Sequence, residues 1–314
     1  NYTVRYLERN TETVLSEEKH EASSDAVITE KFVKIKGYAP DAYQKQLVLS
    51  ADDTKNVLTF WYTKDETHAP LQIIHLIQNL TNDEYTEYQS STNLNATIGT
   101  DYSETPLMLT GFTYNAGKST ASGTLSADGL VLKLYYDRNV YPYKFRFLVQ
   151  GTTETKVADP VTGSARYQAR VTQGAKEVPG YTLVLGTTNP QTIDIVAEEG
   201  NTAVNNVKIF YYVEDTVDIK YEVVGPDGCG TLDNYQNNTV KVVDGTPEGS
   251  TPTASAGFKF VGWYKDKDCT QPVDEAWIEN NRITPQKTAD LGNGTMGYEA
   301  ATYYAKFEYD VADL

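Results

Sequence analysis

The sequence predicts a mainly β protein, or an α+β protein if each repeated unit also holds one short helix. Three observations support this prediction. The chain has 24 Tyr and 2 Met together with many Thr and Val, a composition that favours half-buried pleated surfaces over helices. Apolar and polar residues alternate in several stretches, whereas no long segment shows a convincing 3.6-residue period. The third observation is an internal repeat, which defines the unit of folding.

Length and charge restrict the class of protein. The chain has 314 residues, enough for two or more domains, and its 27 Lys and Arg against 43 Asp and Glu give a net charge of −16. Because no basic run offsets this charge, neither nucleic acid nor an acidic membrane surface is an expected partner. No apolar stretch approaches the ~20 residues of a membrane helix, and no signal peptide is recognisable. The chain enters a strand pattern directly after Asn1, so we expect a segment of a longer protein, with any leader or anchor outside it.

Four units are visible, and each opens with an alternating strand followed by a glycine-aromatic turn. The strand centres read apolar, basic, apolar, and a period of two predicts that the basic residue faces solvent. These centres are Val4-Arg5-Tyr6, Ile74-His75-Leu76, Phe145-Arg146-Phe147 and Ile219-Lys220-Tyr221. The turns are Gly37-Tyr38, Gly111-Phe112, Gly180-Tyr181 and Gly257-Phe258. The sequence intervals between the turn glycines are 111 − 37 = 74, 180 − 111 = 69 and 257 − 180 = 77.

Each unit closes on an apolar strand that ends in aromatic residues, at 57–62, 131–136, 207–212 and 303–307. Polar joints follow at 63–69, 137–141 and 214–216. The predicted modules are therefore 1–66, 67–139, 140–215 and 216–314. Because short linkers limit how far neighbouring modules can swing, we expect a semi-rigid, elongated string of modules.

Two places are candidates for short helices. The fourth unit carries an insert of about twenty residues at 274–297, in which 275–278 could form one or two helical turns. A short helix in each unit, for example at 24–31, is the alternative that would make the fold α+β.

Few residues are suited to catalysis. The histidines, His20, His68 and His75, do not have the i, i+4 spacing of a helical metal pair. His75 stands where Arg5, Arg146 and Lys220 stand in the other units, so we interpret it as a solvent-facing strand residue. His20 and His68 lie in a charged turn and in a joint. We therefore expect no catalytic residue, no metal site and no cofactor.

Other suggestive patterns are better explained as turns. The string from Gly111 to Ser119 resembles a phosphate-binding loop, but five residues rather than four separate its glycines. The paired acids Asp52-Asp53 and Glu198-Glu199 could suggest a glycosidase. Both pairs, however, precede a closing strand, where the second unit has a turn at Asp128-Gly129. Asp266 and Asp268 could help to bind calcium, but no twelve-residue calcium loop is present.

The aromatic pairs at the ends of the closing strands recur at regular sequence intervals, 136 − 62 = 74 and 212 − 136 = 76. The pairs are Trp61-Tyr62, Tyr135-Tyr136 and Tyr211-Tyr212. Their regularity predicts that most of them pack in cores or at joints. Less regular aromatics are better candidates for an exposed contact surface, namely Tyr43, Tyr85, Tyr88 and Trp277.

Both cysteines, Cys229 and Cys269, fall in the fourth unit. A bridge would close a loop of 269 − 229 = 40 residues, which the chain-entropy model values at about 4 kcal/mol. In an oxidising compartment this pairing is the favoured interpretation, and two free thiols are the alternative.

The fourth unit resembles the internalin-type B repeat of bacterial surface proteins. Its matching residues are Gly257, Phe258, Gly262, Trp263 and Tyr264 in the turn and following strand, and Tyr304, Lys306 and Phe307 in the closing strand. The insert departs from the shorter repeat pattern. The first three units are similar to mucin-binding-protein repeats, through their alternating first strand, glycine-aromatic turn and closing aromatic strand.

This resemblance implies β-grasp-like modules in a cell-surface protein of a Gram-positive bacterium, extracellular and anchored to the cell wall through regions outside the segment. It implies a stalk or spacer, or an adhesive region for a host glycoprotein or glycan, without enzymatic activity. A carbohydrate-binding accessory region of a secreted enzyme is the alternative. The sequence does not define the oligomeric state.

Overall fold

The computed structural model describes residues 1–313 and consists almost entirely of β-strands. A four-stranded sheet with the same strand order occurs four times along the chain. In each sheet the first strand of the repeat pairs in parallel with its closing strand, and a further strand flanks this central pair on either side. The prediction of mainly β tandem modules is confirmed. Each sheet lies within one of the four predicted ranges, which we propose as the module boundaries.

The first sheet has the order β2-β1-β6-β4, and a separate ladder joins β3 to β5. Alternation in the first strand turns Tyr2, Val4 and Tyr6 inward, where they pack against Phe60 and Tyr62 of the closing strand. Each such buried side chain contributes about 1.5–3 kcal/mol of hydrophobic stabilisation. The elements are β1 (Tyr2–Glu8), β2 (Val14–His20), β3 (Val27–Lys31), β4 (Tyr38–Pro40), β5 (Gln44–Val48), η1 (Asp53–Lys55) and β6 (Val57–Lys64).

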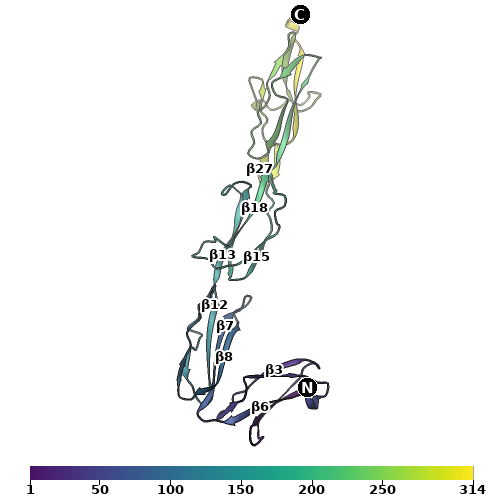
Figure 1. Ribbon diagram of the computed structural model, residues 1–314. Helices are drawn as coiled ribbons and strands as arrows, with labels where there is room; N and C mark the ends of the chain where they lie inside the picture. The colour runs from purple at the N-terminus through teal and green to yellow at the C-terminus, as the bar shows by residue number, and fades with distance from the viewer. Residues whose placement is uncertain (314) are drawn as a thin grey trace. The chain divides into compact units, whose positions relative to one another are not determined.

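The second sheet has the order β8-β7-β12-β10, and β9 pairs with β11. Strands β7, β8 and β12 are labelled in Figure 1. The core contains Leu71, Leu132, Leu134 and Tyr136. The elements are β7 (His68–Gln78), β8 (Tyr85–Thr97), β9 (Asp101–Ser103), β10 (Phe112–Tyr114), β11 (Ser122–Thr124) and β12 (Leu130–Arg138).

The third sheet has the order β14-β13-β18-β16, and β15 pairs with β17. Phe147 and Phe210 are fully buried and stack with their ring centroids 5.3 Å apart. The elements are β13 (Val140–Val149), β14 (Lys156–Arg166), β15 (Arg170–Gln173), β16 (Tyr181–Leu183), β17 (Gln191–Asp194) and β18 (Val207–Glu214).

The fourth sheet has the order β21-β19-β28-β23, and its insert adds two short hairpins. The expected helical turn in the insert is a single 3-10 turn, η2, capped by Asp274. The elements are β19 (Thr216–Val224), β20 (Gly230–Leu232), β21 (Gln236–Lys241), β22 (Pro252–Ala254), β23 (Phe258–Tyr264), η2 (Glu275–Trp277), β24 (Ile278–Glu279), β25 (Arg282–Ile283), β26 (Ala289–Gly292), β27 (Thr295–Gly297), β28 (Ala301–Tyr309) and η3 (Val311–Asp313).

The helix considered at 24–31 does not form, because this segment contains strand β3. Its consecutive β-branched residues, Val27, Ile28 and Thr29, suit a strand better than a helix. Across residues 1–313 the helical elements are the three 3-10 turns. None of the described helices is long and apolar enough to cross a membrane.

The contacts divide the chain into two compact units. The first comprises 1–142, 164–169 and 194–202, and the second comprises 143–163, 170–193 and 203–314. Two segments of the third module, 164–169 and 194–202, thus belong with the preceding modules. The first unit therefore contains a joint between the second and third modules, and the second unit contains a joint between the third and fourth.

The prediction for His75 is wrong, because this residue is buried rather than solvent-facing. His75 is 2% exposed and stands opposite Leu134 in the parallel register, just as Tyr6 stands opposite Phe60 in the first sheet. His75 therefore occupies the inward position of Tyr6. A one-residue shift of the alignment exchanges the two faces of a strand.

The aromatic pairs at the closing strands divide between the two faces of each sheet. Tyr62, Tyr136 and Tyr212 are fully buried in their cores. The preceding residues, Trp61, Tyr135 and Tyr211, are only half-buried. Period-two alternation requires this division, so the core prediction is confirmed for the second residue of each pair and not for the first.

Candidate functional site: the joints between modules

The glycine-aromatic turns lie directly beside the joints. All four glycines have a left-handed φ, of +78° at Gly37, +80° at Gly111, +81° at Gly180 and +81° at Gly257, a conformation that strongly favours glycine. Each glycine carbonyl accepts a hydrogen bond of 2.9–3.0 Å from the backbone N–H that follows its closing strand. The donors are Asp65, Asn139, Asp215 and Asp310. Every turn is thereby tied to the residues that follow its closing strand.

The joint between the second and third modules is built around Tyr167. A Cβ atom on Gly111 would lie 2.3 Å from ring atoms of Tyr167, so this ring rests directly on the glycine turn. The backbone N–H of Tyr167 donates to the carbonyl of Asn139 at 2.8 Å. The Tyr167 ring also meets Phe112 edge-on, with centroids 5.9 Å apart. Aromatic contacts of this geometry contribute about 0.5–1.5 kcal/mol each.

Two arginines hold the same joint. Arg138 lies over the Phe112 ring at 4.7 Å and donates to the carbonyl of Tyr167 at 2.9 Å. Burial lowers the pKa of Arg138 below its ordinary value, although a guanidinium remains charged at physiological pH. Arg166 donates to the carbonyls of Asn79 and Asn82 and pairs with Asp83. Both guanidinium groups thus connect backbone of two modules.

At the joint between the third and fourth modules, a residue of the following module again covers the glycine turn, but this residue is aliphatic rather than aromatic. A Cβ atom on Gly180 would lie 2.5 Å from Cγ2 of Val243 and 3.1 Å from Cδ1 of Leu291. The buried Glu214 carboxylate accepts hydrogen bonds from the backbone N–H groups of Val243 at 2.8 Å and Asp244 at 2.7 Å. Hydrogen bonds to an ionised acceptor are among the stronger ones in proteins.

Tyr181 adds a polar contact at this joint. Its hydroxyl lies 3.5 Å from a carboxylate oxygen of Asp244. Burial, followed by the nearby charges of Glu214 and Asp244, raises the pKa of Tyr181 to about 12. The phenol therefore stays protonated at physiological pH and can act as a donor.

The first joint is less tightly covered. Asp65 accepts hydrogen bonds from the backbone N–H groups of Thr67 at 2.8 Å and His68 at 2.9 Å, and Leu94 packs against the first module's core. A Cβ atom on Gly37 would meet nothing within 4 Å. This glycine turn is therefore open, unlike those at Gly111 and Gly180.

The residues that cover the turns were not recognised from the sequence. Tyr167 follows Asn139 at a sequence offset of 167 − 139 = 28, and Val243 follows Asp215 at the same offset, 243 − 215 = 28. At the first joint, where the turn is open, Leu94 packs against the first module's core and follows Asp65 at a similar offset, 94 − 65 = 29. An apolar residue at this nearly constant offset from the joint is the signal that could have identified them.

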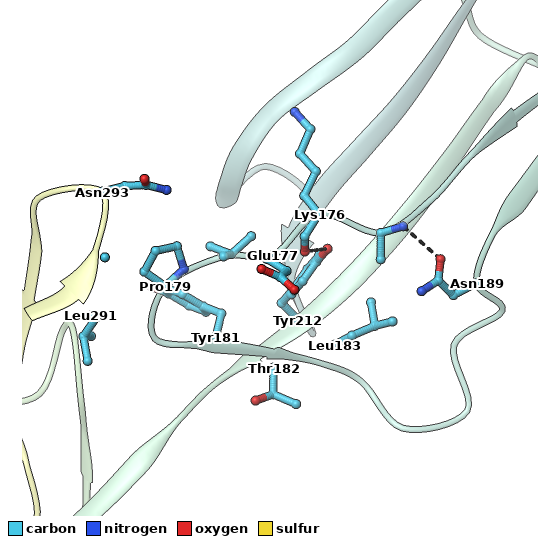
Figure 2. Close-up of a pocket in the computed structure, with 13 residues that line it drawn as sticks. Lys176, Glu177, Pro179, Tyr181, Thr182, Leu183, Asn189, Tyr212, Leu291 and Asn293 are labelled. Carbon is cyan, nitrogen blue, oxygen red and sulfur yellow. Dashed lines mark hydrogen bonds between the residues drawn. The ribbon is translucent and has the colours of Figure 1, made fainter.

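A groove of about 710 Å³ opens beside the third joint. Figure 2 shows Pro179 and Tyr181 of the third module next to Leu291 of hairpin β26–β27, with Asn293 at the tip of that hairpin. The side-chain oxygen of Asn189 is fixed by the backbone N–H of Ala175 at 2.9 Å. Because the hairpin belongs to the insert at 274–297, the insert forms one wall of the groove.

The motif residues of the fourth unit occupy structural positions. Trp263 is 1% exposed, stands opposite Ala305, and donates through Nε1 to the carbonyl of Asn281 at 2.8 Å. Phe307 is likewise buried. Gly257 and Phe258 begin the turn and strand β23, Gly262 lies at a register shift opposite Lys306, and Tyr264 stands opposite Tyr304.

The two cysteines are free in the structure, so the favoured disulfide is not formed there. Cys229 lies in the fourth core, where its sulfur would be 2.9 Å from a Cβ atom on Gly225. Cys269 lies near the ammonium group of Lys306, the residue that precedes the inward-facing Phe307 in β28.

The remaining candidates serve local structure. His68 pairs with Asp65 at 3.0 Å and His20 with Glu18 at 3.3 Å. Asp52 caps η1, and Asp53 pairs with the amino group of Asn1. The sequence after Gly111 forms a turn in which Asn115 accepts from the backbone N–H of Lys118 at 3.0 Å.

No described group of residues is arranged to hold a metal ion. The Asp266 carboxylate accepts from the backbone N–H groups of Thr270 and Gln271, and its pKa is lowered chiefly by a hydrogen bond from the Thr270 side chain. Within residues 1–313 no three metal-binding side chains gather at one point. Both ring nitrogens of the buried His75 have protein partners: Nδ1 lies 2.8 Å from the Tyr136 hydroxyl, and Nε2 lies 3.5 Å from Oε1 of Glu104.

Tandem mixed sheets with packed joints define a modular repeat protein, and the sequence comparisons agree with that class. The chain resembles a bacterial surface repeat protein of the internalin type. It is 23% identical to internalin J of Listeria monocytogenes serotype 4b (strain F2365) over 314 residues, which cover 94% of this chain and 33% of that protein. Internalin J of serovar 1/2a (strain ATCC BAA-679 / EGD-e) is 22% identical over 312 residues, covering 92% and 35%. The chain thus spans about a third of the curated relatives it matches. No protein-family model matches the sequence.

Two solved structures are also similar. The Bacillus anthracis TIE protein has a TM-score of 0.38 and 12% identity, covering 84% of this chain and 53% of that one. The type 2 repeat of the mucus binding protein MUB from Lactobacillus reuteri has a TM-score of 0.17 and 12% identity, covering 44% and 98%. At TM-scores below 0.5, neither structure supports a conclusion about this chain.

Proposed function

We propose that this chain is a non-enzymatic tandem-repeat region of a Gram-positive bacterial cell-surface protein. It lies outside the cell, is anchored to the cell wall through other regions, and acts as a semi-rigid spacer. The same region carries adhesive surface for a host glycoprotein or glycan. The similarity to internalin J supports the class of protein, and neither of these two relatives is named as an enzyme.

The spacer role is carried by one observation, the covered glycine turn at the joint. Gly111 is covered by Tyr167 and Gly180 by Val243, and each covering residue comes from the next module. Such contacts remove apolar surface at the joint from water, and each Å² of apolar surface buried stabilises the joint by about 25 cal/mol. A joint held in this way resists bending, which is what a spacer requires.

A distance measurement across a joint tests this role. Spin labels at K133C and V213C lie on exposed residues of the central strands β12 and β18, in a C229A/C269S background that leaves no other thiol. We expect one narrow peak in the electron–electron distance distribution. The substitution Tyr167→Ala removes the side chain that covers Gly111 and should broaden the peak.

The matched control is Tyr88→Ala, because Tyr88 is 52% exposed and lies outside the joint. This substitution should leave the distribution unchanged. A broad distribution in the unsubstituted protein would show independently moving modules and contradict the spacer role.

A second candidate function is that of a carbohydrate-binding accessory region of a secreted enzyme, and the groove beside the third joint favours it. Tyr181 and Pro179 offer ring surfaces, while Glu177 and Asn293 offer polar groups. Sugars bind to such combinations of stacking and hydrogen-bonding groups. A glycan array tests the groove itself: binding that Y181A abolishes would support this candidate, and no signal above background would remove it.

A further inference from the structure

In each of the four sheets, an edge strand flanks the first strand of the unit. Three of these edge strands are protected against pairing with another chain. They are β2, β14 and β21, which flank the first strand of their units. Strand β2 carries Glu17, Glu18 and Lys19, and β14 has Pro160 within it. Strand β21 has only six residues, with Thr239 at a φ of +53° and a register shift. Charge, proline, shortness and irregularity are the usual devices that blunt an edge.

The corresponding strand of the second module, β8, lacks these devices over most of its length. It has 13 residues, more than twice the usual strand length, and contains no proline or glycine. Its single charged residue is Glu87, in a chain with a net charge of −16. From Thr86 to Ser91 every residue is exposed, so neither face of this stretch is covered.

A regular segment lies between two irregularities in β8. Register shifts occur beside Tyr88 and around Leu94, and between them Gln89–Asn93 pair without interruption with β7. Leu94 itself packs against the first module, which limits the free edge to the part before it. The available segment is therefore Gln89-Ser90-Ser91-Thr92-Asn93, which is polar and uncharged.

We propose that β8 pairs in antiparallel fashion with β8 of a second copy of this chain, joining two four-stranded sheets edge to edge. A two-fold register centred on Ser91, the middle of this segment, sets Gln89 against Asn93 and Ser90 against Thr92. No like charges meet, and hydroxyl and amide side chains face one another, which stabilises cross-strand pairs. The absence of charge on this segment lets it approach its copy although the rest of each chain is acidic.

The association is weak in solution and matters where copies are crowded. Five residues span about 17 Å of strand, and such a contact buries less than the roughly 1,200 Å² of a stable interface. Tethering raises the effective concentration and converts weak contacts into avidity. Because both copies carry −16, salt should strengthen the pairing by screening their repulsion.

Sedimentation equilibrium of the complete 314-residue chain, across rising protein concentrations at 0.15 and 0.5 M NaCl, tests the proposal. We expect a monomer–dimer equilibrium that shifts toward dimer at the higher salt. The variant Q89K/S91K places lysines along the edge and should reduce association at least tenfold, although it lowers the net negative charge. Mixing it with Q89E/S91E should restore association, since opposite charges then meet.

The matched control is T162K/S164K, which makes the same change on two exposed residues of the proline-containing edge strand β14. It should associate like the unsubstituted chain, and circular dichroism should show that all variants are folded. A chain that stays monomeric at every concentration and salt, or a dimer that Q89K/S91K leaves intact, would overturn the proposal. Neither outcome bears on the spacer role, which the spin-label distances test separately.

Discussion

The hydroxyl of Tyr62 donates a hydrogen bond of 2.6 Å to the backbone carbonyl of Val33, which precedes the turn glycine Gly37 at a sequence offset of 37 − 33 = 4. Two other modules repeat this link with the same offset. Tyr212 donates to the carbonyl of Lys176 at 2.7 Å, and Tyr136 accepts from the N–H of Leu107 at 2.9 Å. Each link connects the closing strand to the segment that leads into the turn. In the fourth module Ala305 takes this place and Trp263 fills the space.

Removing the phenol oxygen should destabilise a module. In Tyr62→Phe and Tyr212→Phe the buried carbonyl partner loses its donor, which costs about 1–3 kcal/mol. Denaturant unfolding should show this loss, with a lower midpoint and an unchanged slope. Tyr88→Phe, at a residue 52% exposed, is the control and should change stability by less than about 0.5 kcal/mol. Equal stability of all three variants would show that the link has no structural role.

Alanine substitution of the turn glycines should separate covered turns from open ones. All four glycines have a φ near +80°, so each substitution costs about 1 kcal/mol of backbone strain. In Gly111→Ala and Gly180→Ala the new methyl group also meets Tyr167 or Val243, and such overpacking costs a further ~1–3 kcal/mol.

Gly37→Ala and Gly257→Ala are the matched controls, since their Cβ atoms would meet nothing within 4 Å. Thermal unfolding should place the two covered variants below the two open ones. The same melting temperature in all four variants would mean that Tyr167 and Val243 do not closely contact the turn glycines.

Acid should weaken the first joint through Asp65. Hydrogen bonds, first from the backbone N–H of Thr67, lower the pKa of Asp65 from 3.8 to about 2. A lowered pKa means that the folded state favours the carboxylate, so its contribution is complete above the unfolded value near 4 and is lost as the pH falls toward 2. Stability measured between pH 5 and pH 2 should fall less in Asp65→Asn than in the unsubstituted chain. Identical pH profiles would contradict this assignment.

Much of the local structure was predictable, because strands, turns and caps depend on neighbouring residues. The glycine turns were predicted from turn chemistry that short sequences display, whereas the cap that Asp52 forms on η1 and the turn at Asp266 were not. The helical turn at Glu275 was predicted for the same reason. The closing strands were equally clear, since their alternation buries Tyr62, Tyr136 and Tyr212.

The failures concern register and contacts between distant residues. Strand β7 has apolar residues on both faces and two register shifts, so alternation could not place His75. The two cysteines share a module but are free, because which residues of a module meet is decided by strands far apart in sequence. Tyr167 and Val243 cover turns of the preceding module, and within one repeat nothing marks that role. Their role is marked only by the constant sequence offset of each residue from the joint that precedes it.

The two thiols should differ in reactivity. Cys229 is buried and Cys269 is partly exposed, and burial raises the pKa of both thiols, so access to the reagent distinguishes them. A thiol reagent should therefore modify one cysteine per folded chain and two after unfolding in guanidinium chloride. A reagent that finds no thiol in the unfolded, unreduced chain would demonstrate the disulfide instead.

Small-angle scattering tests the spacer account most directly. A single compact globule of 314 residues should have a radius of gyration of about 20 Å. Four modules of ~75 residues in a line should extend about 120 Å, with a radius of gyration near ~35 Å. The account predicts the larger value for the radius of gyration extrapolated to infinite dilution. A radius of gyration close to that of the globule would contradict it and would show that the modules collapse onto one another.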